Sequence, residues 1–263
     1  MFDFHKEKQR YFDIQKMVTS EEIIPWMQRK IALSSQTRVL EIGCGEAGVL
    51  AAFLELNCDC VGIELSDSRV KSAENFLAPF IEKGKAKIIN ENIYDIVEHN
   101  SIGTFDLIIL KDVIEHIPDQ ERFIGVLPSL LKPNGIVFFA YPPWWMPFGG
   151  HQQIAKSKFL RMAVWIHLLP KYLYTFILKA FGESNATIKE LEEVKSTGIT
   201  IDKMYQILSK YHYTIIDEIY WFINPIYKYK FGFQKRKVMQ WLTKIPYLRN
   251  FYTTAHYIMF TRE

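Results

Sequence analysis

Between residues 37 and 140, short apolar runs alternate with stretches whose apolar positions have helical spacing. The run Phe105-Asp-Leu-Ile-Ile-Leu110 is apolar almost throughout, as in a strand that is covered on both faces. The predicted strands comprise residues 37–42, 58–65, 87–90, 105–110 and 136–140, and the predicted helices comprise residues 47–57, 66–83 and 119–131. This rhythm predicts βαβ units in a doubly wound parallel α/β sheet, with a ligand at the carboxyl ends of the strands.

After Ala140 this alternation stops, and a long aromatic insertion with two helical stretches follows. A helix over residues 201–211 and strands over 213–223 and 255–262 resume the pattern, with a basic helix expected around Lys235–Lys237 between the two strands. We therefore divide the chain into four parts. These are an N-terminal helical segment over the ligand site (1–34), a ligand-binding core (35–141), a helical cap insertion (142–197), and the completion of the core (198–263).

The composition indicates a folded protein and does not identify a binding partner. The 263 residues are 49% hydrophobic and 23% charged, which is typical of a folded core, and the formal charge of +3 gives no reason to expect a nucleic-acid partner. The three cysteines are too few and too clustered for a disulfide framework, and no secretory signal is visible. The longest apolar run, residues 162–170, is far shorter than a bilayer span. We therefore expect a cytoplasmic protein.

The stretch VLEIGCGEAG, residues 39–48, contains Gly43-x-Gly45-x-x-Gly48, which is the spacing of a dinucleotide-binding turn. Glu64 ends the next predicted strand, 21 residues after Gly43, where a carboxylate can accept hydrogen bonds from ribose hydroxyls. Binding sites for several nucleotide-like ligands share these features.

The charges beside the loop discriminate between those ligands. A pyrophosphate would meet Glu41 and Glu46, and one like-charge contact at about 4 Å costs about 4 kcal/mol at an effective dielectric constant of about 20. S-adenosylmethionine carries a sulfonium and an ammonium group and no phosphate. The loop therefore favours S-adenosylmethionine, and a nicotinamide-dependent oxidoreductase is the alternative.

Four stretches in the same order resemble motifs of the class I S-adenosylmethionine-dependent methyltransferases, namely Val39–Gly48, Gly62–Ser66, Glu91–Ile96 and Phe105–Asp119. The last stretch is similar to the small-molecule branch that includes ubiquinone-type O-methyltransferases. The resemblance covers residues 35–141 and implies a Rossmann-like seven-stranded sheet of order 3-2-1-4-5-7-6, with strand 7 antiparallel and with helical cap insertions. Asn92 stands where the family more commonly has Asp, and Lys111 replaces a small polar residue.

The resemblance also implies which residues bind the cofactor. We predict contacts with S-adenosylmethionine from Glu41, Gly43, Cys44, Gly45, Gly48, Glu64, Leu65, Asn92, Ile93 and Lys111.

Asp112, Glu115 and His116 follow the fourth predicted strand, at the mouth of the expected site. A comparable cluster in ubiquinone-type relatives is associated with a divalent metal. Three interpretations stay open here: stabilisation of the loop, proton transfer by Asp112 or His116, and metal binding. We assign Asp112 and His116 as candidate catalytic residues and predict no resident metal.

The segment Tyr141-Pro-Pro-Trp-Trp-Met-Pro-Phe-Gly-Gly-His151 follows the fifth strand, over the expected position of the methyl group. His151 is a candidate base because imidazole titrates near neutral pH, and a hydrogen-bonded loop histidine is the alternative. The Pro-Pro-aromatic sequence also resembles a motif of methyltransferases that act on nucleic-acid bases. In those enzymes it follows strand four, so we set that function aside.

Residues 157–181 are rich in aromatic residues and leucine, with lysines between them. They suit a packed cap, a hydrophobic acceptor pocket, or a helix that contacts a membrane surface. The predicted function is methyl transfer from S-adenosylmethionine to an oxygen, or less favourably a nitrogen or carbon, of a small and partly apolar molecule. A quinone-like, a lipid-linked and a sugar acceptor all stay open. A fold that has lost catalysis and serves as an interaction protein is a further alternative, and the oligomeric state is not predicted.

Overall fold

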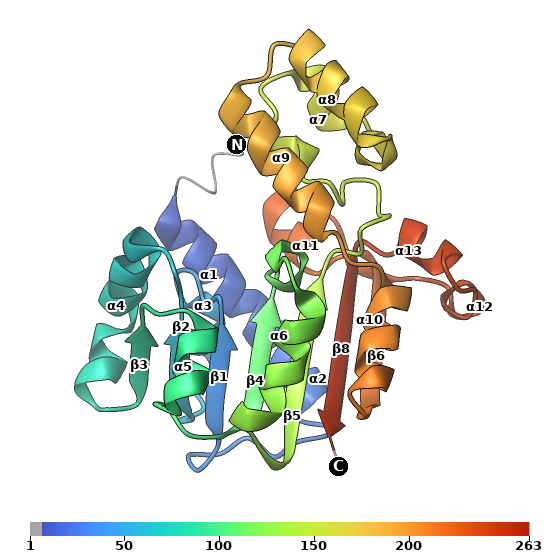
Figure 1. Cartoon of the computed structure of the whole chain (residues 1–263). Helices are drawn as coiled ribbons and strands as arrows, with labels where there is room; N and C mark the ends of the chain where they lie inside the picture. The colour runs from blue at the N-terminus through green and yellow to red at the C-terminus, as the bar shows by residue number, and fades with distance from the viewer. Residues whose placement is uncertain (1–6, 263) are drawn as a thin grey trace.

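The computed structural model describes residues 7–262, which form one eight-stranded sheet of order β3-β2-β1-β4-β5-β8-β6-β7 (Figure 1). The strands are β1 (Arg38–Ile42), β2 (Asp59–Ile63), β3 (Ala86–Ile89), β4 (Phe105–Lys111), β5 (Leu131–Tyr141), β6 (Tyr213–Ile223), β7 (Arg236–Lys237) and β8 (Ala255–Arg262). The first five strands pair in parallel, and β8 pairs antiparallel with both β5 and β6. The predicted strand order is confirmed, with β8 in the place of the seventh strand.

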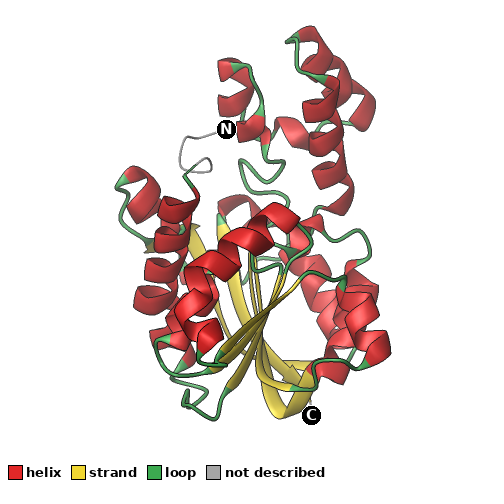
Figure 2. Cartoon of the chain, turned by 90° about the vertical axis from the view of Figure 1, so that its left-hand side faces the viewer, coloured by secondary structure: helices red, strands yellow, loops and turns green. Residues whose placement is uncertain are grey.

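Helices cover both faces of this sheet (Figure 2). The helices are α1 (Lys8–Val18), α2 (Ile24–Met27), α3 (Gly48–Leu54), α4 (Asp67–Glu82), α5 (Ile93–His99), α6 (Gln120–Val126), α7 (Lys158–Met162), α8 (Lys171–Ala180), α9 (Asn185–Thr197), α10 (Ile201–Lys210), α11 (Ile226–Phe231), α12 (Gln240–Thr243) and α13 (Leu248–Tyr252). Alternate residues of the central strands pack into two separate cores, because successive side chains of a strand point to opposite faces.

Several helices begin where the sequence supplies a side-chain cap. The Asn92 side chain accepts a hydrogen bond from the backbone N–H of Tyr94 at the start of α5, and Asp119 accepts one from Arg122 at the start of α6. Thr200 does the same for Lys203 at the start of α10. These caps satisfy N–H groups that have no partner inside the helix.

The segment around Lys235–Lys237 is not the basic helix that we predicted. Arg236 and Lys237 form the short edge strand β7, which pairs antiparallel with Trp221 and Ile223 of β6. The unpaired edge of β6 offers backbone hydrogen bonds that local sequence periodicity does not reveal. The predicted seven-stranded sheet therefore gains an eighth, two-residue strand.

The aromatic insertion also contains more helix than we predicted. Residues 142–197 hold the three α-helices α7, α8 and α9, where we expected two helical stretches, and α7 is only five residues long. Helix α5 was missed, and β5 begins at Leu131, five residues before the strand that we predicted over 136–140. Short helices and irregular strand pairing leave little periodic signal.

The cap helices α7, α8 and α9 stand beyond the carboxyl ends of the parallel strands (Figure 1). They enclose a small core of their own, made by Ala155, Leu160, Tyr174, Leu178, Ile188 and Leu191. None of the described helices combines the length and the apolar character needed to cross a bilayer.

Candidate functional site

The glycine loop lies between β1 and α3, at the carboxyl edge of the sheet. Gly43 has φ of +73°, and a Cβ there would lie 2.6 Å from Cγ2 of Val113, which follows β4. A side chain at Gly43 is therefore excluded both by the left-handed backbone and by the close approach of the segment that follows β4. The tight turn predicted from the glycine spacing is present.

Gly48 is constrained by helix packing. A Cβ at this position would lie 2.4 Å from the carbonyl oxygen of Phe12 and 2.8 Å from Cβ of Gln15, both in α1. Because Gly48 is the first residue of α3, the missing side chain allows α1 to pack directly against the start of α3. Its predicted contact with the cofactor stays a prediction.

Glu64 lies just beyond β2 and holds the glycine loop in place. Its Oε2 accepts a hydrogen bond from the N–H of Gly45 at 2.9 Å, and its Oε1 accepts one from the N–H of Ser66, also at 2.9 Å. Each carboxylate oxygen has a second lone pair, so the same group can also accept bonds from ribose hydroxyls. Leu65 beside it is 66% exposed, which leaves an apolar surface next to the carboxylate.

Asn92 and Ile93 lie at the start of α5, beyond β3. The side chain of Asn92 is occupied by its cap on α5, and Ile93 is buried in the core on the α5 side of the sheet. Their predicted contacts with the cofactor stay predictions.

Glu41, in β1, carries a carboxyl group that is buried and incompletely bonded. The residue is 3% exposed, and its Oε2 has no hydrogen-bond partner among the described residues. Burial raises the pKa of Glu41 well above its usual value, although the nearby Lys111 opposes the shift. Because an unsatisfied buried acceptor is costly, this oxygen suits a hydrogen-bond donor. A cationic donor such as the ammonium group of S-adenosylmethionine would favour the ionised carboxylate that burial disfavours.

Cys44 is a buried thiol within the loop. Burial, reinforced by Glu41, raises its pKa well above the usual value, so the thiol stays protonated. A Cβ on Gly62 of β2 would lie 2.8 Å from the Cys44 sulfur, which shows how closely the loop packs against β2. The side chain acts in packing, and its predicted contact with the cofactor stays a prediction.

Lys111 and Asp112 form an ion pair where β4 ends. The Lys111 side chain is 2% exposed, and its Nζ lies 2.5 Å from Oδ2 of Asp112. Burial acts to lower the pKa of Lys111, but Asp112 and the phenols of Tyr257 and Tyr11 outweigh it, and the pKa is raised. Burial likewise acts to raise the pKa of Asp112, and Lys111 outweighs it, so this pKa is lowered. Both groups are therefore charged at neutral pH.

The structure brings together two histidines that are 35 positions apart in the sequence. The rings of His116 and His151 lie 5.0 Å apart, centroid to centroid. Burial lowers the pKa of His151 to about 4, with His116 adding to the shift, and burial also lowers the pKa of His116. Both imidazoles are therefore neutral at pH 7.

Glu115 completes this cluster. One ligand atom from each of Glu115, His116 and His151 lies within 4.8 Å of the others. Burial and Asp112 raise the pKa of Glu115 well above its usual value, and its Oε2 has no partner in the described part of the chain. Two imidazoles and one carboxylate are ligands that suit a divalent transition metal, so the alternative of a metal stays open beside our prediction of none.

Helices α1 and α11 supply further residues around Asp112, and α1 lies in the N-terminal segment that we expected over the site. Gln15 donates a hydrogen bond to the Tyr11 hydroxyl at 2.6 Å, and burial raises the pKa of Tyr11, against the opposing charge of Lys111. From α11, Tyr227 and Lys230 lie close enough to Asp112 for its charge to act on their pKa values. Lys230 belongs to no sequence motif, so its placement was not predicted.

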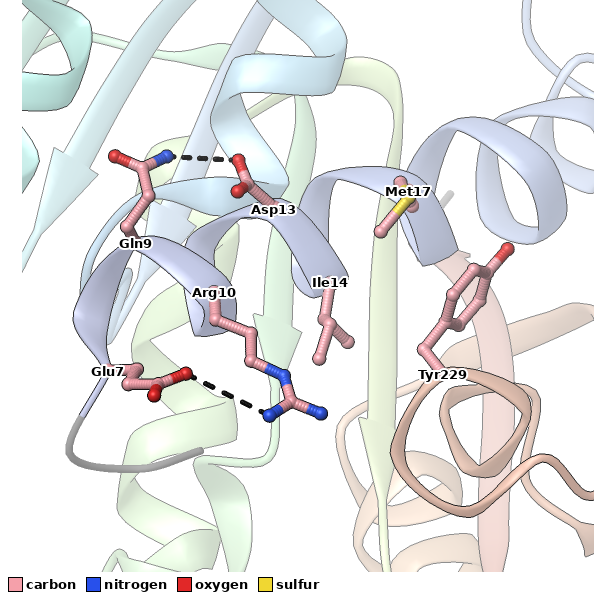
Figure 3. A pocket seen from close by; sticks show the side chains of 7 residues that line it. All are labelled: Glu7, Gln9, Arg10, Asp13, Ile14, Met17 and Tyr229. Atoms are coloured by element: carbon pink, nitrogen blue, oxygen red, sulfur yellow. Dashed lines mark hydrogen bonds and ion pairs between the residues drawn. The ribbon is translucent and has the colours of Figure 1, made fainter. Parts of the chain in front are cut away.

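A separate hollow of about 510 Å³ lies on the outer side of α1, beside Tyr229 (Figure 3). It is lined by Glu7, Gln9, Arg10, Asp13, Ile14, Met17 and Tyr229. None of these residues is a predicted site residue.

Residues 16–175 match the model of a protein family described as a methyltransferase domain. This match covers more than half of the chain. The chain belongs to the methyltransferase domain family. The glycine loop is accordingly the loop of a class I S-adenosylmethionine-dependent methyltransferase, and the nicotinamide alternative is set aside.

Several curated relatives of this methyltransferase share the same name. The ubiquinone biosynthesis O-methyltransferase of Rhodopseudomonas palustris (strain HaA2) is 26% identical over 69% of this chain and 74% of its own length. A protein of the same name from Bordetella avium is 26% identical, over 44% of this chain and 47% of its own length. The similarity is distant.

Solved structures show the same fold. Magnesium protoporphyrin IX methyltransferase from Synechocystis PCC 6803 with bound SAH gives a TM-score of 0.56 at 14% identity, covering 100% of this chain and 89% of that one. An S-adenosylmethionine-dependent methyltransferase from Clostridium acetobutylicum gives 0.57 at 11% identity, covering 95% and 92%.

Proposed function

We propose that this methyltransferase transfers the methyl group of S-adenosylmethionine to an oxygen of a small, partly apolar molecule. The observation that carries the proposal is the cluster of neutral imidazoles and ionised Asp112 at the edge of the sheet, adjoining the cofactor loop. The distant ubiquinone O-methyltransferase relatives support the choice of oxygen.

The cofactor would lie along the carboxyl ends of β1, β2 and β4. In this proposal Glu64 accepts bonds from the ribose hydroxyls, Leu65 and Ile93 contact the adenine, and the free Oε2 of Glu41 faces the positive end of the ligand. S-adenosylmethionine supplies an electrophilic methyl group on sulfur. The chain's contribution is to hold the acceptor oxygen in line with that methyl, since alignment accounts for much of the acceleration in such reactions.

His151, His116 and Asp112 are the proposed groups for the acceptor's proton. A neutral His151 can accept a proton at pH 7, but a pKa of about 4 makes it a weak base. It would therefore act best on an acceptor whose hydroxyl is already acidic, such as a phenol or an enol. The nearby Asp112 would stabilise the imidazolium that forms.

We also propose that a hydrophobic or lipid-linked acceptor approaches past the cap. Several apolar side chains of this insertion remain outside its small core and face solvent, namely Phe159, Met162, Val164, Trp165, Tyr172, Phe176 and Phe181. Such a surface supports either an apolar acceptor or a contact with a membrane surface through residues 157–181.

The proposed reaction is tested by incubating the protein with cell extract and S-adenosylmethionine labelled in its methyl group. Mass spectrometry should find a labelled small molecule whose label lies in an O-methyl group. A labelled N-methyl or C-methyl product would contradict the choice of oxygen. Absence of any labelled product, with the cofactor bound, would favour the interaction protein that has lost catalysis.

A further inference from the structure

The insertion between β6 and β8 is strongly basic. Residues 224–254 contain seven of the chain's 32 Lys and Arg residues and none of its 29 Asp and Glu residues. The whole chain has a formal charge of +3, so it would be acidic without this insertion. A basic stretch without acidic residues attracts negatively charged partners.

Only some of these cations are paired within the fold. Lys228, Lys235 and Arg249 form ion pairs with acidic side chains of other segments. In contrast, Arg236 and Lys244 are exposed, and neither forms an ion pair within the described part of the chain. The charges of these two side chains are therefore available to a partner outside the chain.

Large apolar side chains lie exposed beside these two cations. Met239 is 61% exposed, Trp241 is 59% exposed, Tyr247 is 57% exposed and Ile245 is 38% exposed. Exposed apolar side chains gathered on one short segment are typical of a surface that contacts a partner. We define the basic-aromatic surface by six residues, namely Arg236, Met239, Trp241, Lys244, Ile245 and Tyr247.

The fold holds this segment in place from its inner side. Val238 and Leu242 are buried in a small core together with residues of α10 and β6. Asn250 is fully buried as well, and its side chain donates a hydrogen bond to Oδ2 of Asp202 in α10 at 2.6 Å. Because the segment is fixed at both ends, the exposed side chains between these anchors stay on the outside of the fold.

The basic-aromatic surface adjoins the aromatic side chains of the cap. The ring centroid of Tyr247 lies 5.9 Å from that of Trp145, which follows β5. The ring centroid of Phe251 in α13 lies 6.4 Å from that of Trp165 in the cap. Helices α12 and α13 lie on the opposite side of the molecule from α4 and β3 (Figure 1). Two insertions that are far apart in the sequence therefore meet through aromatic contacts.

The mixture of side chains favours a lipid bilayer over other anionic partners. Lys and Arg bind the phosphates of phospholipids, and Trp and Tyr prefer the boundary between headgroups and acyl chains. Aliphatic side chains such as those of Met239 and Ile245 are stabilised when they enter the acyl region. A single-stranded nucleic acid would engage the cations and stack on the rings, but it would leave these aliphatic side chains in water.

We propose that the basic-aromatic surface docks on a bilayer that contains anionic phospholipids. This contact is separate from residues 157–181 of the cap and comes from a different insertion. The inference does not rest on the proposed function, because the surface binds the bilayer whatever the acceptor is. If the acceptor is lipid-linked, a methyltransferase held at the bilayer meets its acceptor there.

The test is co-sedimentation of the full chain with two kinds of vesicle. One kind is phosphatidylcholine alone, and the other is phosphatidylcholine mixed with phosphatidylglycerol. The variant Arg236→Gln/Lys244→Gln removes two charges from the surface, and Trp241→Ser/Ile245→Ser removes two apolar side chains. All four residues are exposed, so these substitutions leave the core unchanged.

The control variant is Lys71→Gln/Lys83→Gln, which removes two exposed charges from α4 and its C-terminal end. Thermal unfolding and calorimetry with S-adenosylhomocysteine confirm that each variant is folded and binds the cofactor. Binding of a labelled single-stranded RNA is measured by fluorescence anisotropy under the same conditions. This measurement separates the two kinds of anionic partner.

We expect the wild type to bind the mixed vesicles about tenfold or more tightly than vesicles of phosphatidylcholine alone. Each double variant of the surface should weaken binding to the mixed vesicles about tenfold or more, because each removes two groups that contact the bilayer. Added salt should weaken the binding of the wild type, since it screens the charges. The control variant should bind as the wild type does.

Equal binding to the two kinds of vesicle, or no binding to either, would overturn the inference. A surface variant of either kind that binds as the wild type does would also overturn it. Binding of the RNA without binding of the vesicles would assign the surface to nucleic acid and reject the bilayer. The proposed function fails by a different result, namely the lack of an O-methylated product.

Discussion

At the residue scale, we propose that Glu64 connects the fold to the cofactor. Its two oxygens accept bonds from the backbone N–H groups of Gly45 and Ser66, so the carboxylate holds the loop that it is proposed to share with the ribose. Glu64→Ala should weaken binding of S-adenosylmethionine by about 1.5–3 kcal/mol through the loss of charge-assisted hydrogen bonds. Isothermal titration calorimetry measures this change, with Glu64→Gln as the isosteric control. Undiminished affinity in the alanine variant would reject the assignment.

The proposed role of His151 affects the rate of methyl transfer and not the binding of the cofactor. His151→Ala should lower kcat by about a hundredfold or more, which is typical of losing a general base, and leave the affinity for S-adenosylhomocysteine unchanged. The rate is measured on the labelled acceptor identified from extract, with calorimetry beside it. A loss of cofactor affinity equal to the loss of rate would indicate a structural role for this residue.

His167 supplies a prediction about stability. The side chain is fully buried, its Nε2 lies 2.8 Å from the carbonyl oxygen of Trp144, and burial lowers its pKa to about 4. The unfolded chain binds a proton at the ordinary value near 6.5, before the folded chain does, so stability is lost as pH falls from about 6.5 to 4. Between pH 7 and 4 the free energy of unfolding should fall further in the wild type than in His167→Gln, by at most about 3 kcal/mol. Denaturant unfolding measures this free energy for both proteins across the pH range. An equal fall in the two proteins would contradict the assignment.

At the scale of elements, the sequence predicted what is periodic and missed what depends on pairing partners. The strands β1, β2, β4, β5 and β8 are visible as apolar runs, because both of their faces are largely buried. The less buried strands β3 and β6 were also predicted. The edge strand β7 was taken for a helix, since only its partner β6 makes Arg236 and Lys237 extended. The four-part division of the chain at residues 34, 141 and 197 stays a prediction.

The same distinction holds for the site. Glu41, Gly43 and Glu64 follow from a contiguous motif and from strand ends. The approach of His151 to His116 and of Lys230 to Asp112 depends on two insertions folding back over the sheet, which no local spacing encodes. Tertiary placement, and not the type of residue, was the missing information.

Helix α8 carries the prediction for the cap. Tyr172 and Phe176 are four residues apart, so they share a face, and they are 77% and 67% exposed. If this face enters a membrane surface, Tyr172→Ser/Phe176→Ser should lower co-sedimentation with anionic phospholipid vesicles about tenfold or more, since each buried ring contributes about 1.5 kcal/mol. Phe222→Ser, which alters an exposed ring on β6, serves as the control. Wild-type protein that does not sediment with the vesicles, or a double variant that sediments equally, would reject the membrane contact and leave the packed cap and the acceptor pocket.

At the scale of the whole molecule, the candidate site residues lie at one edge of the sheet. The glycine loop and Glu64 come from the first βαβ unit, and Asp112 and His116 come from the segment after β4. The two insertions bring His151 and Lys230 close to this segment. A parallel sheet places its strand ends together, which is why residues from distant segments meet there. The family supplies the cofactor, and in our proposal the insertions of this chain supply the surroundings of the acceptor.

The central claim is that the acidic glycine loop selects a positively charged methyl donor over a phosphorylated coenzyme. Its most direct test is calorimetric titration of the full chain with S-adenosylmethionine and, separately, with NADH. We predict saturable binding of one S-adenosylmethionine per chain and no binding of NADH. Binding of NADH without binding of S-adenosylmethionine would contradict the account.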